Sequence, residues 1–276
     1  MKTLEKRETI LFITGAFVSH TTWNRWISYF EDKGYNAIAP SWPHKEKSAA
    51  ELRALQPHDH ELAALTLSGV VSHYAQIALR LGEKPVVIGH SLGGLVAQIL
   101  INQGYAKGGV AIHAVPPKGV IPYEFTFLKS SWKLLGLFSS LKKTYLMSFA
   151  DFQYAFGNGM SYEEQAEAYE LYAIPESKRV GRGGLTDAAF VDYSKRHAPL
   201  LLTAGLDDNV IPAHLTRRVF NKYRKGTSVL EYAEFATNHS VLTHDDWEIE
   251  ASYIANFLEI NIPAAQPFAA AGLQKV

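Results

Sequence analysis

Short apolar runs that alternate with helical patterns constrain the fold of this chain more than any other feature. Most of these runs are followed by a segment whose apolar residues recur at helical spacing. Parallel strands joined by helices have this rhythm, because a crossover between parallel strands needs a dozen or more residues. We therefore predict an α/β fold with a mostly parallel, doubly wound sheet. The predicted strands cover residues 10–13, 36–39, 85–89, 109–115, 199–205 and 228–235, and the predicted helices cover 21–34, 68–81, 92–103, 212–223 and 247–258.

The alternation lapses in the middle of the chain. From residue 116 to residue 196 the sequence is rich in aromatic residues and shows short helical patterns instead of strands. The strand and helix rhythm resumes after this stretch. We therefore predict an α/β core formed by residues 1–115 and 197–276, with residues 116–196 inserted as a helical cap.

Composition narrows the classes of partner and chemistry. The 276 residues include 27 Lys and Arg and 27 Asp and Glu, and this balance argues against a nucleic-acid or anionic-membrane partner. There are no cysteines, which excludes disulfides, thiolate zinc sites and a thiol nucleophile. No secretory apolar region follows the charged N-terminus, and no apolar run approaches the roughly 18 residues of a membrane span. We expect a cytoplasmic protein, and the sequence leaves its oligomeric state open.

A serine among glycines marks the candidate nucleophile. Gly89-His90-Ser91-Leu92-Gly93 joins the predicted strand 85–89 to the predicted helix 92–103. A sharp strand-to-helix turn exposes one hydroxyl at the carboxyl edge of a sheet, and it needs small neighbours on both sides. Gly-x-Ser-x-Gly in this context predicts a nucleophile elbow with Ser91 at its tip.

A serine hydroxyl needs a general base, and the base needs a carboxylate that fixes its tautomer. In sheets with such an elbow the chain order is Ser, then Asp or Glu, then His. Asp208 follows the strand 199–205, with Asp207 as the competing acid. His239 follows the last predicted strand, with His244 as the competing base. We predict Ser91, Asp208 and His239 as the catalytic residues.

The oxyanion of an acyl-transfer intermediate needs backbone donors. One predicted donor is the N–H of Leu92, directly after the nucleophile. The other comes from the loop Thr14-Gly15-Ala16-Phe17 after the first predicted strand, where Gly15 permits close backbone approach. We predict the Ala16 N–H as this second donor.

With these residues in place, the chain resembles the α/β-hydrolase family along nearly its whole length. The resemblance is carried by the elbow 89–93, the Gly-x-x-Asp-x-x-x-Pro segment 205–212 and His239. The stretches Ala-Pro-Ser-Trp-Pro at 39–43 and Pro-Glu-Ser-Lys-Arg at 175–179 are similar to a bacterial subgroup whose substrates are poorly defined. The resemblance implies a sheet of about eight strands, a cap over the active site, and neither a metal nor an organic cofactor.

One position departs from the family pattern. Family members usually carry His-Gly after the first strand, and this chain has Thr14-Gly15. The usual histidine helps to pack the oxyanion loop, so this substitution leaves the loop geometry open. Because the donors are backbone groups, the oxyanion hole can survive the change.

The predicted reaction is hydrolysis of a carboxylic ester with a small, partly apolar substrate. The same residues also fit a lactonase, a thioesterase, a cofactor-free haloperoxidase or a C–C hydrolase, and a ligand-binding receptor can keep the same fold. Acyl and alcohol specificity are not encoded in these motifs. Three further residues near strand ends fit either a pocket-lining or a structural role, namely His20, Trp42 and His113.

Overall fold

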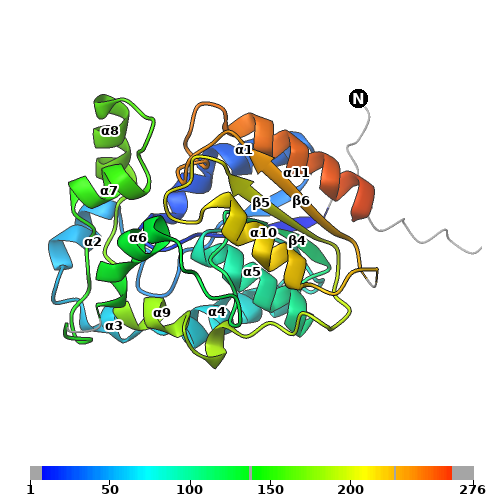
Figure 1. The fold of residues 1–276 in the computed structure, drawn as a ribbon, viewed down its shortest axis with the longest axis horizontal. Coiled ribbons are helices and arrows are strands. Elements are labelled where there is room, and N and C mark those ends of the chain that lie inside the picture. Colours follow the sequence, from blue (N-terminus) through cyan, green and yellow to red (C-terminus); the bar gives the residue numbers. More distant parts are fainter. Residues whose placement is uncertain (1–7, 137–138, 227, 263–276) are drawn as a thin grey trace, which may run out of the picture.

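A six-stranded sheet in which every neighbouring pair is parallel forms the centre of the molecule (Figure 1). The computed structural model describes residues 8–136, 139–226 and 228–262. In space the strands follow the order β2-β1-β3-β4-β5-β6. Their bounds are β1 Thr9–Ile13, β2 Asn36–Ile38, β3 Val86–His90, β4 Gly108–Ile112, β5 Leu200–Gly205 and β6 Leu230–Phe235. The predicted α/β class and parallel sheet are confirmed.

The strand count differs from the one that the family resemblance implies. That resemblance suggests about eight strands, whereas the described residues form six. These six coincide with the six apolar runs read from the sequence, each within three residues at either end. The number eight came from the family, and the described part of this chain has no further run of strand type to supply the other two.

Helices cover both faces of the sheet (Figure 1). The helices α1 (Asn24–Asp32) and α11 (Trp247–Asn261) pack on one face, and α4 (Leu67–Arg80), α5 (Leu92–Gln103) and α10 (Ala213–Lys222) pack on the other. Each of the five corresponds to a predicted helix. The first predicted helix begins instead as a 3₁₀ turn, η1 (His20–Trp23), that leads directly into α1.

The period-two geometry of strands explains why two cores form. Along β1, Ile10 and Phe12 contact the α1 and α11 side, whereas Leu11 and Ile13 contact the α4 and α5 side. All residues of β1, β3, β4 and β5 are buried, as expected for parallel strands covered on both faces. Within the described chain, no helix combines the length and the apolar character needed to cross a bilayer.

The segment between β4 and β5 contains short helices that gather at one side of the sheet (Figure 1). They are α6 (Phe125–Leu135), α7 (Phe149–Ala155), α8 (Tyr162–Tyr172), α9 (Lys178–Gly183) and the 3₁₀ turn η2 (Asp187–Ala189). Serine side chains cap α7, α8 and α9 at their N-termini, which satisfies backbone donors at those ends. This is the segment that we predict to be a cap.

Two helices missing from the sequence prediction join this group. The helices α2 (Ala49–Leu55) and α3 (His60–Ala64) lie beside α8 and α9 respectively. Arg53 of α2 donates to the backbone carbonyls of Tyr169, Glu170 and Ala173 at the end of α8. The helical side of the molecule is therefore built from two separate stretches of the chain.

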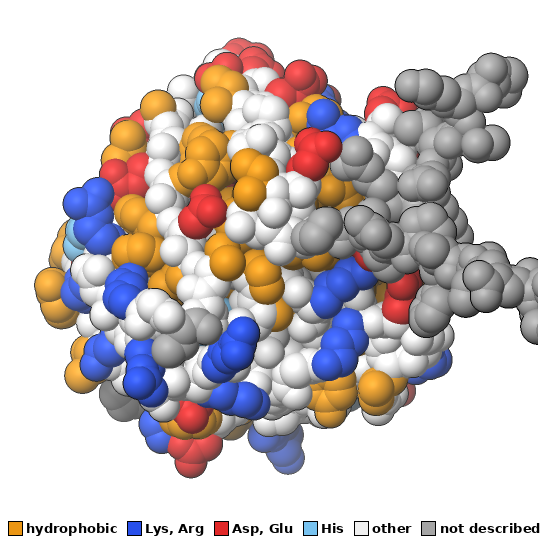
Figure 2. Space-filling model, turned by 90° about the vertical axis from the view of Figure 1, so that its right-hand side faces the viewer, with side chains coloured by type: hydrophobic (Ala, Val, Ile, Leu, Met, Phe, Trp, Pro, Cys, Tyr) orange, Lys and Arg blue, Asp and Glu red, His pale blue; other side chains and the backbone are white. Residues whose placement is uncertain are grey.

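The opposite side of the molecule carries a mixed surface. Figure 2 shows basic and acidic side chains interspersed with apolar ones on the face that lies farthest from α6–α9. This distribution agrees with the equal numbers of basic and acidic residues in the chain.

Candidate active site

The elbow at Ser91 has the strained backbone that the motif predicts. Ser91 connects β3 to α5 with φ of 56° and ψ of −120°, a region that costs a non-glycine residue on the order of 1–3 kcal/mol. A Cβ at Gly89 would lie 2.0 Å from the carbonyl oxygen of Gly93, and a Cβ at Gly93 would lie 2.1 Å from that of Ile13. Only glycine fits at these two positions, because the backbone segments touch there.

The three predicted catalytic side chains meet at the carboxyl edge of the sheet. His239 Nε2 lies 2.9 Å from Ser91 Oγ, and His239 Nδ1 lies 2.7 Å from Asp208 Oδ2. The side chains of His239 and Asp208 are fully buried, and Ser91 is 5% exposed. These distances are hydrogen-bond distances. A hydroxyl, an imidazole and a carboxylate therefore form one continuous line.

The turn after β5 distinguishes the two candidate acids. Asp208 Oδ1 accepts hydrogen bonds from the backbone N–H groups of Val210 and Ile211, both at 2.7 Å, so the carboxylate closes its own turn and faces His239. Asp207 is exposed to solvent. Burial would raise the pKa of Asp208, but His239 and His113 outweigh it and hold that pKa below its usual range.

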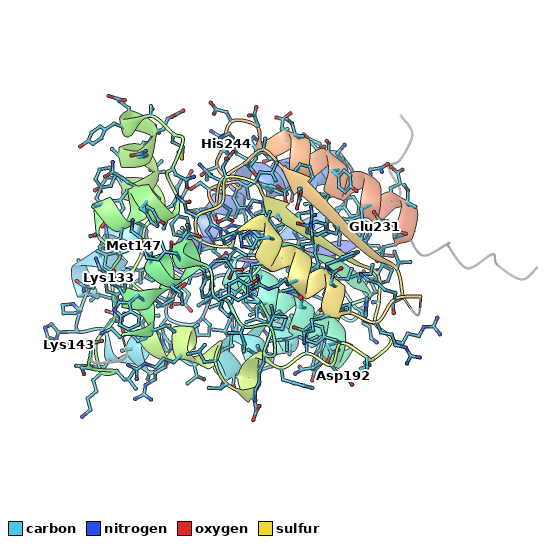
Figure 3. All side chains as sticks on the ribbon, viewed as in Figure 1. Lys133, Lys143, Met147, Asp192, Glu231 and His244 are labelled. Carbon is cyan, nitrogen blue, oxygen red and sulfur yellow. The ribbon has the colours of Figure 1, made fainter. Side chains whose placement is uncertain are left out.

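The two candidate bases also lie in different places. His239 sits at the end of the loop that follows β6, where Asn238 Oδ1 accepts from the backbone N–H of Ser240. Phe156 packs edge-on against the His239 ring, with centroids 5.1 Å apart. His244 lies in the loop before α11 (Figure 3), where its Nδ1 accepts from the backbone N–H of Asp246. His239 is the histidine that reaches Ser91.

The two predicted oxyanion donors lie beside Ser91. Ala16 and Leu92 both line the cavity that contains Ser91. Within the described residues, neither backbone N–H has a hydrogen-bond acceptor. The neighbouring Phe17 N–H, by contrast, donates to the carboxylate of Glu176. In this loop the backbone therefore leaves the Ala16 N–H available to a ligand.

The loop that lacks the usual histidine is held by residues far away in the chain. Trp42 Nε1 donates to the carbonyl of Thr14 at 3.0 Å, and Glu176 Oε2 accepts from the Phe17 N–H at 3.2 Å. Trp42 and Glu176 belong to the two stretches that resemble the bacterial subgroup. Backbone anchoring from both sides thus replaces the packing that a histidine at position 14 would supply.

A buried ion pair completes this anchor. Lys45 Nζ lies 2.5 Å from Glu176 Oε2, and both side chains are nearly inaccessible to solvent. The ammonium also lies 4.0 Å from the centre of the Trp42 ring, where a cation–π attraction is expected. Burial lowers the pKa of Lys45, and the charge of Glu176 opposes that shift. The loop 14–17 is therefore tied both to the segment 42–45 and to Glu176.

An apolar cavity of about 360 Å³ opens above Ser91. Its floor is formed by Ala16, Ser91 and Leu92, and its other walls come largely from the segment 116–196. Met147, which lies beside α6 and α7 (Figure 3), lines this cavity. The remaining apolar lining includes Val120, Ile121, Phe127, Leu134, Leu135, Phe156, Val210 and Ile211. Such a lining suits an apolar ligand group next to a polar reacting end.

A second histidine and a second carboxylate lie behind Asp208. His113 Nδ1 is 3.1 Å from Asp208 Oδ2, and His113 Nε2 is 3.5 Å from Glu250 Oε2, with all three side chains fully buried. The contacts have ion-pair distances without hydrogen-bond angles. Burial would lower the pKa of His113, but Glu250 and Asp208 outweigh it and raise this pKa to about 9.

Three imidazole rings of this region could in principle approach a metal ion. Ring nitrogens of His90, His113 and His239 lie within 4.8 Å of one another. However, both nitrogens of His239 are used by Ser91 and Asp208, and both nitrogens of His113 face carboxylates. A metal here would have to displace these contacts, so we assign none to the site.

His20, Trp42 and His113, for which the sequence fits either a pocket-lining or a structural role, lie outside the Ser91 cavity. Trp42 anchors the loop at Thr14, His113 lies behind Asp208, and His20 borders a small separate space near Trp42. Sequence reasoning did not find Glu250. A signal existed, since Glu250 occupies an apolar-face position of the last helix, four residues before the buried Ile254 and eight before Leu258.

Comparison with known proteins supports the fold independently. The profile described as the alpha/beta hydrolase family matches residues 10–251. No curated protein sequence matches this chain. Among solved structures, the monoacylglycerol lipase of Paleococcus ferrophilus is similar, with a TM-score of 0.64 and 19% identity over 91% of this chain and 94% of that one.

Two further structures show the same fold. A pyrethroid hydrolase from Sphingobium faniae JZ-2 has a TM-score of 0.62 at 18% identity, over 91% of this chain and 97% of that one. Tomato methylketone synthase I, complexed with 2-tridecanone, has a TM-score of 0.65 at 12% identity, over 92% of this chain and 99% of that one. Because the family profile spans most of the sequence, this chain belongs to the alpha/beta hydrolase family.

Proposed function

We propose that this protein is a serine hydrolase that cleaves carboxylic esters through an acyl-enzyme. The observation that carries the proposal is the line from Ser91 Oγ through His239 to Asp208, at 2.9 and 2.7 Å, on the floor of an apolar cavity. This arrangement can lower the barrier to attack by a hydroxyl that is otherwise a weak nucleophile.

The first half of the reaction forms the acyl-enzyme. Ser91 Oγ attacks the ester carbonyl carbon while His239 Nε2 takes the hydroxyl proton. Asp208 stabilises the resulting imidazolium, and the N–H groups of Ala16 and Leu92 face the negative oxygen. The tetrahedral intermediate then breaks its bond to the alkoxy oxygen, which leaves as the alcohol after it receives the proton from His239.

The second half restores the free enzyme. A water molecule gives a proton to His239 Nε2 and attacks the acyl carbon. The second tetrahedral intermediate breaks its bond to Ser91 Oγ, which takes the proton back from His239. The net reaction consumes one ester and one water and yields one carboxylic acid and one alcohol.

The cavity supports an ester with an apolar portion. Its walls carry few polar side chains, so the acyl or alcohol group next to the reacting carbonyl would be hydrocarbon-like. Two of the similar structures bear the names lipase and pyrethroid hydrolase, which is consistent with hydrolytic chemistry on this fold. We also propose that the segment 116–196 acts as the cap that selects this group.

The decisive experiment compares Ser91→Ala with Ser131→Ala, because both serines line the same cavity. With p-nitrophenyl butyrate, we expect Ser91→Ala to lose at least about 10⁴-fold in kcat and Ser131→Ala to keep activity within a few fold. A fluorophosphonate probe should label the wild type and Ser131→Ala but not Ser91→Ala. A single burst without turnover would instead indicate a receptor, and labelling that survives in Ser91→Ala would refute the assignment.

A further inference from the structure

We infer that His113, anchored by Glu250, is a positioning residue whose positive charge weakens the pull of Asp208 on the proton of His239. The inference rests on the proposed function, because it assigns Asp208 and His239 to the catalytic line. It adds two residues behind that line, in the order Glu250, His113, Asp208, His239, Ser91. Neither added residue lines the Ser91 cavity, so their action on the reaction is indirect.

The geometry places one carboxylate between two imidazoles. Asp208 Oδ2 lies 2.7 Å from His239 Nδ1 and 3.1 Å from His113 Nδ1. Its other oxygen, Oδ1, accepts from two backbone N–H groups of the turn after β5. Both imidazoles therefore face the same oxygen atom, His239 in a hydrogen bond and His113 at an ion-pair distance.

The chemistry of the ring indicates that His113 carries two protons. A neutral imidazole has one N–H donor and one lone pair. In either neutral tautomer, the lone pair of His113 would face a buried carboxylate, at 3.1 Å on one side or 3.5 Å on the other. Only the imidazolium presents N–H groups to both Asp208 and Glu250. The raised pKa of His113, about 9, agrees with this reading.

The charges of the surrounding elements support the same protonation state. The ring of His90, from β3, also faces this cluster, but its burial lowers its pKa well below the usual value, so that it stays neutral. The two carboxylates, one from the turn after β5 and one from α11, then need a cation. His113, after β4, supplies it. An imidazolium at His113 then places one positive charge on the side of Asp208 away from Ser91.

The backbone holds His113 in an unusual conformation. Directly after β4 its φ is +44°, a region that non-glycine residues rarely adopt. Its N–H donates to the carbonyl of Thr203 on the neighbouring strand at 3.0 Å. This conformation, fixed by a strand on one side and by Glu250 of α11 on the other, directs the ring beneath Asp208 instead of into the cavity.

The test is the substitution His113→Gln, which keeps a polar side chain but removes the charge. Without the cation, His239 holds its proton more firmly. For rings 6.3 Å apart, Coulomb's law at an effective dielectric of about 20 predicts that the acid limb of the kcat/KM profile moves up by about two pH units. KM at the pH optimum should stay within about two-fold. A loss of kcat at every pH without movement of the limb would reduce His113 to a packing role and overturn the inference.

The control is His197→Gln. His197 is partly buried, whereas His113 is fully buried, and His197 precedes β5, at the end of the strand opposite to Asp208. The same substitution there should leave the acid limb in place. If both variants move the limb equally, the shift does not arise from the charge behind Asp208.

A second measurement needs no activity, and its first arm uses the wild type alone. In the wild type labelled with ¹⁵N-histidine, assigned by through-bond correlation, His113 should retain both ring protons from pH 6 to 8 and lose one only as the pH approaches about 9. In Glu250→Gln this loss should occur at lower pH. A neutral His113 at pH 7 in the wild type would refute the inference. Because the readout is spectroscopic, it stays separate from any failure to hydrolyse esters.

Discussion

The floor of the Ser91 cavity and the α6 side of the same cavity differ in how deeply their residues are buried. On the floor, every residue of α5 from Leu92 to Ile101 is buried, as are all residues of β1 and β3. On the other side, α6 has no buried residue, and Phe125 and Trp132 are 76% and 56% exposed. Close packing fixes side-chain geometry, so the proposed reacting groups lie in the tightly packed region and the proposed ligand-contacting groups lie in the more exposed region.

This contrast has a physical logic. A catalytic line loses efficiency when its atoms move by about 1 Å, whereas a wall that contacts apolar groups tolerates changes in shape. The two regions should therefore respond to substitution with effects of different kind and size. Changes at the sheet edge should remove turnover, and changes on α6 should alter which ester is preferred.

The largest effect is expected at the buried acid. Asp208→Asn should lower kcat by about 10⁴-fold, because an amide cannot fix the same tautomer of His239 or stabilise the imidazolium. The matched control is Asp207→Asn, one residue earlier and exposed, which should keep kcat within a few fold. Steady-state hydrolysis of p-nitrophenyl butyrate compares the two. Equal losses would break the distinction between the buried and the exposed carboxylate.

An intermediate effect is expected where the two regions are joined. Lys45→Met would leave Glu176 buried without its cation, and such a break costs about 3–5 kcal/mol of unfolding free energy. Urea denaturation measures this loss. Lys47→Met, at an exposed lysine two residues away, should change the stability by less than about 0.5 kcal/mol. Similar values for both would show that the buried pair does not tie the loop to the segment 116–196.

The smallest effect is expected on α6. Phe127 lines the cavity, and Phe127→Ala should raise KM for long-chain p-nitrophenyl esters by about ten-fold, since each lost apolar contact weakens binding modestly. The acetate ester should show no change in kcat. Trp132→Ala, on the same helix but outside the lining residues, should alter neither. A loss of kcat for acetate in Phe127→Ala would mean that α6 also positions the reacting groups.

The sequence predicted the core well because its signals are local. Most strands are short apolar runs, and each long helix repeats its apolar face over several turns. The short helices α2 and α3 were missed, since seven and five residues offer too little periodicity to detect. Their stability comes from distant contacts, such as those of Arg53 with the end of α8, and no local pattern records these.

The candidate site also has parts with local sequence signals and parts that depend on distant contacts. Chain order and elbow context predicted Ser91 and His239 and favoured Asp208 over Asp207. They could not predict the turn that Asp208 itself closes, which buries its carboxylate beside His239. His113 and Glu250 are 137 positions apart in the printed sequence, and their meeting depends on how α11 packs on the sheet. The loop with Thr14 in place of the usual histidine was equally unpredictable, because its anchors come from Trp42 and Glu176.

The hydrogen bond from the Phe17 N–H to Glu176 links the position of the cavity wall to the order of the backbone beside Ala16. Glu176 belongs to the segment that walls the cavity, whereas Phe17 follows directly after Ala16. Any opening of that segment wide enough to break this bond would also release the backbone that we propose stabilises the developing negative charge. The open state that admits a bulky ester would then lack the ordered backbone donor. Turnover would begin only after the segment 116–196 has closed over the cavity.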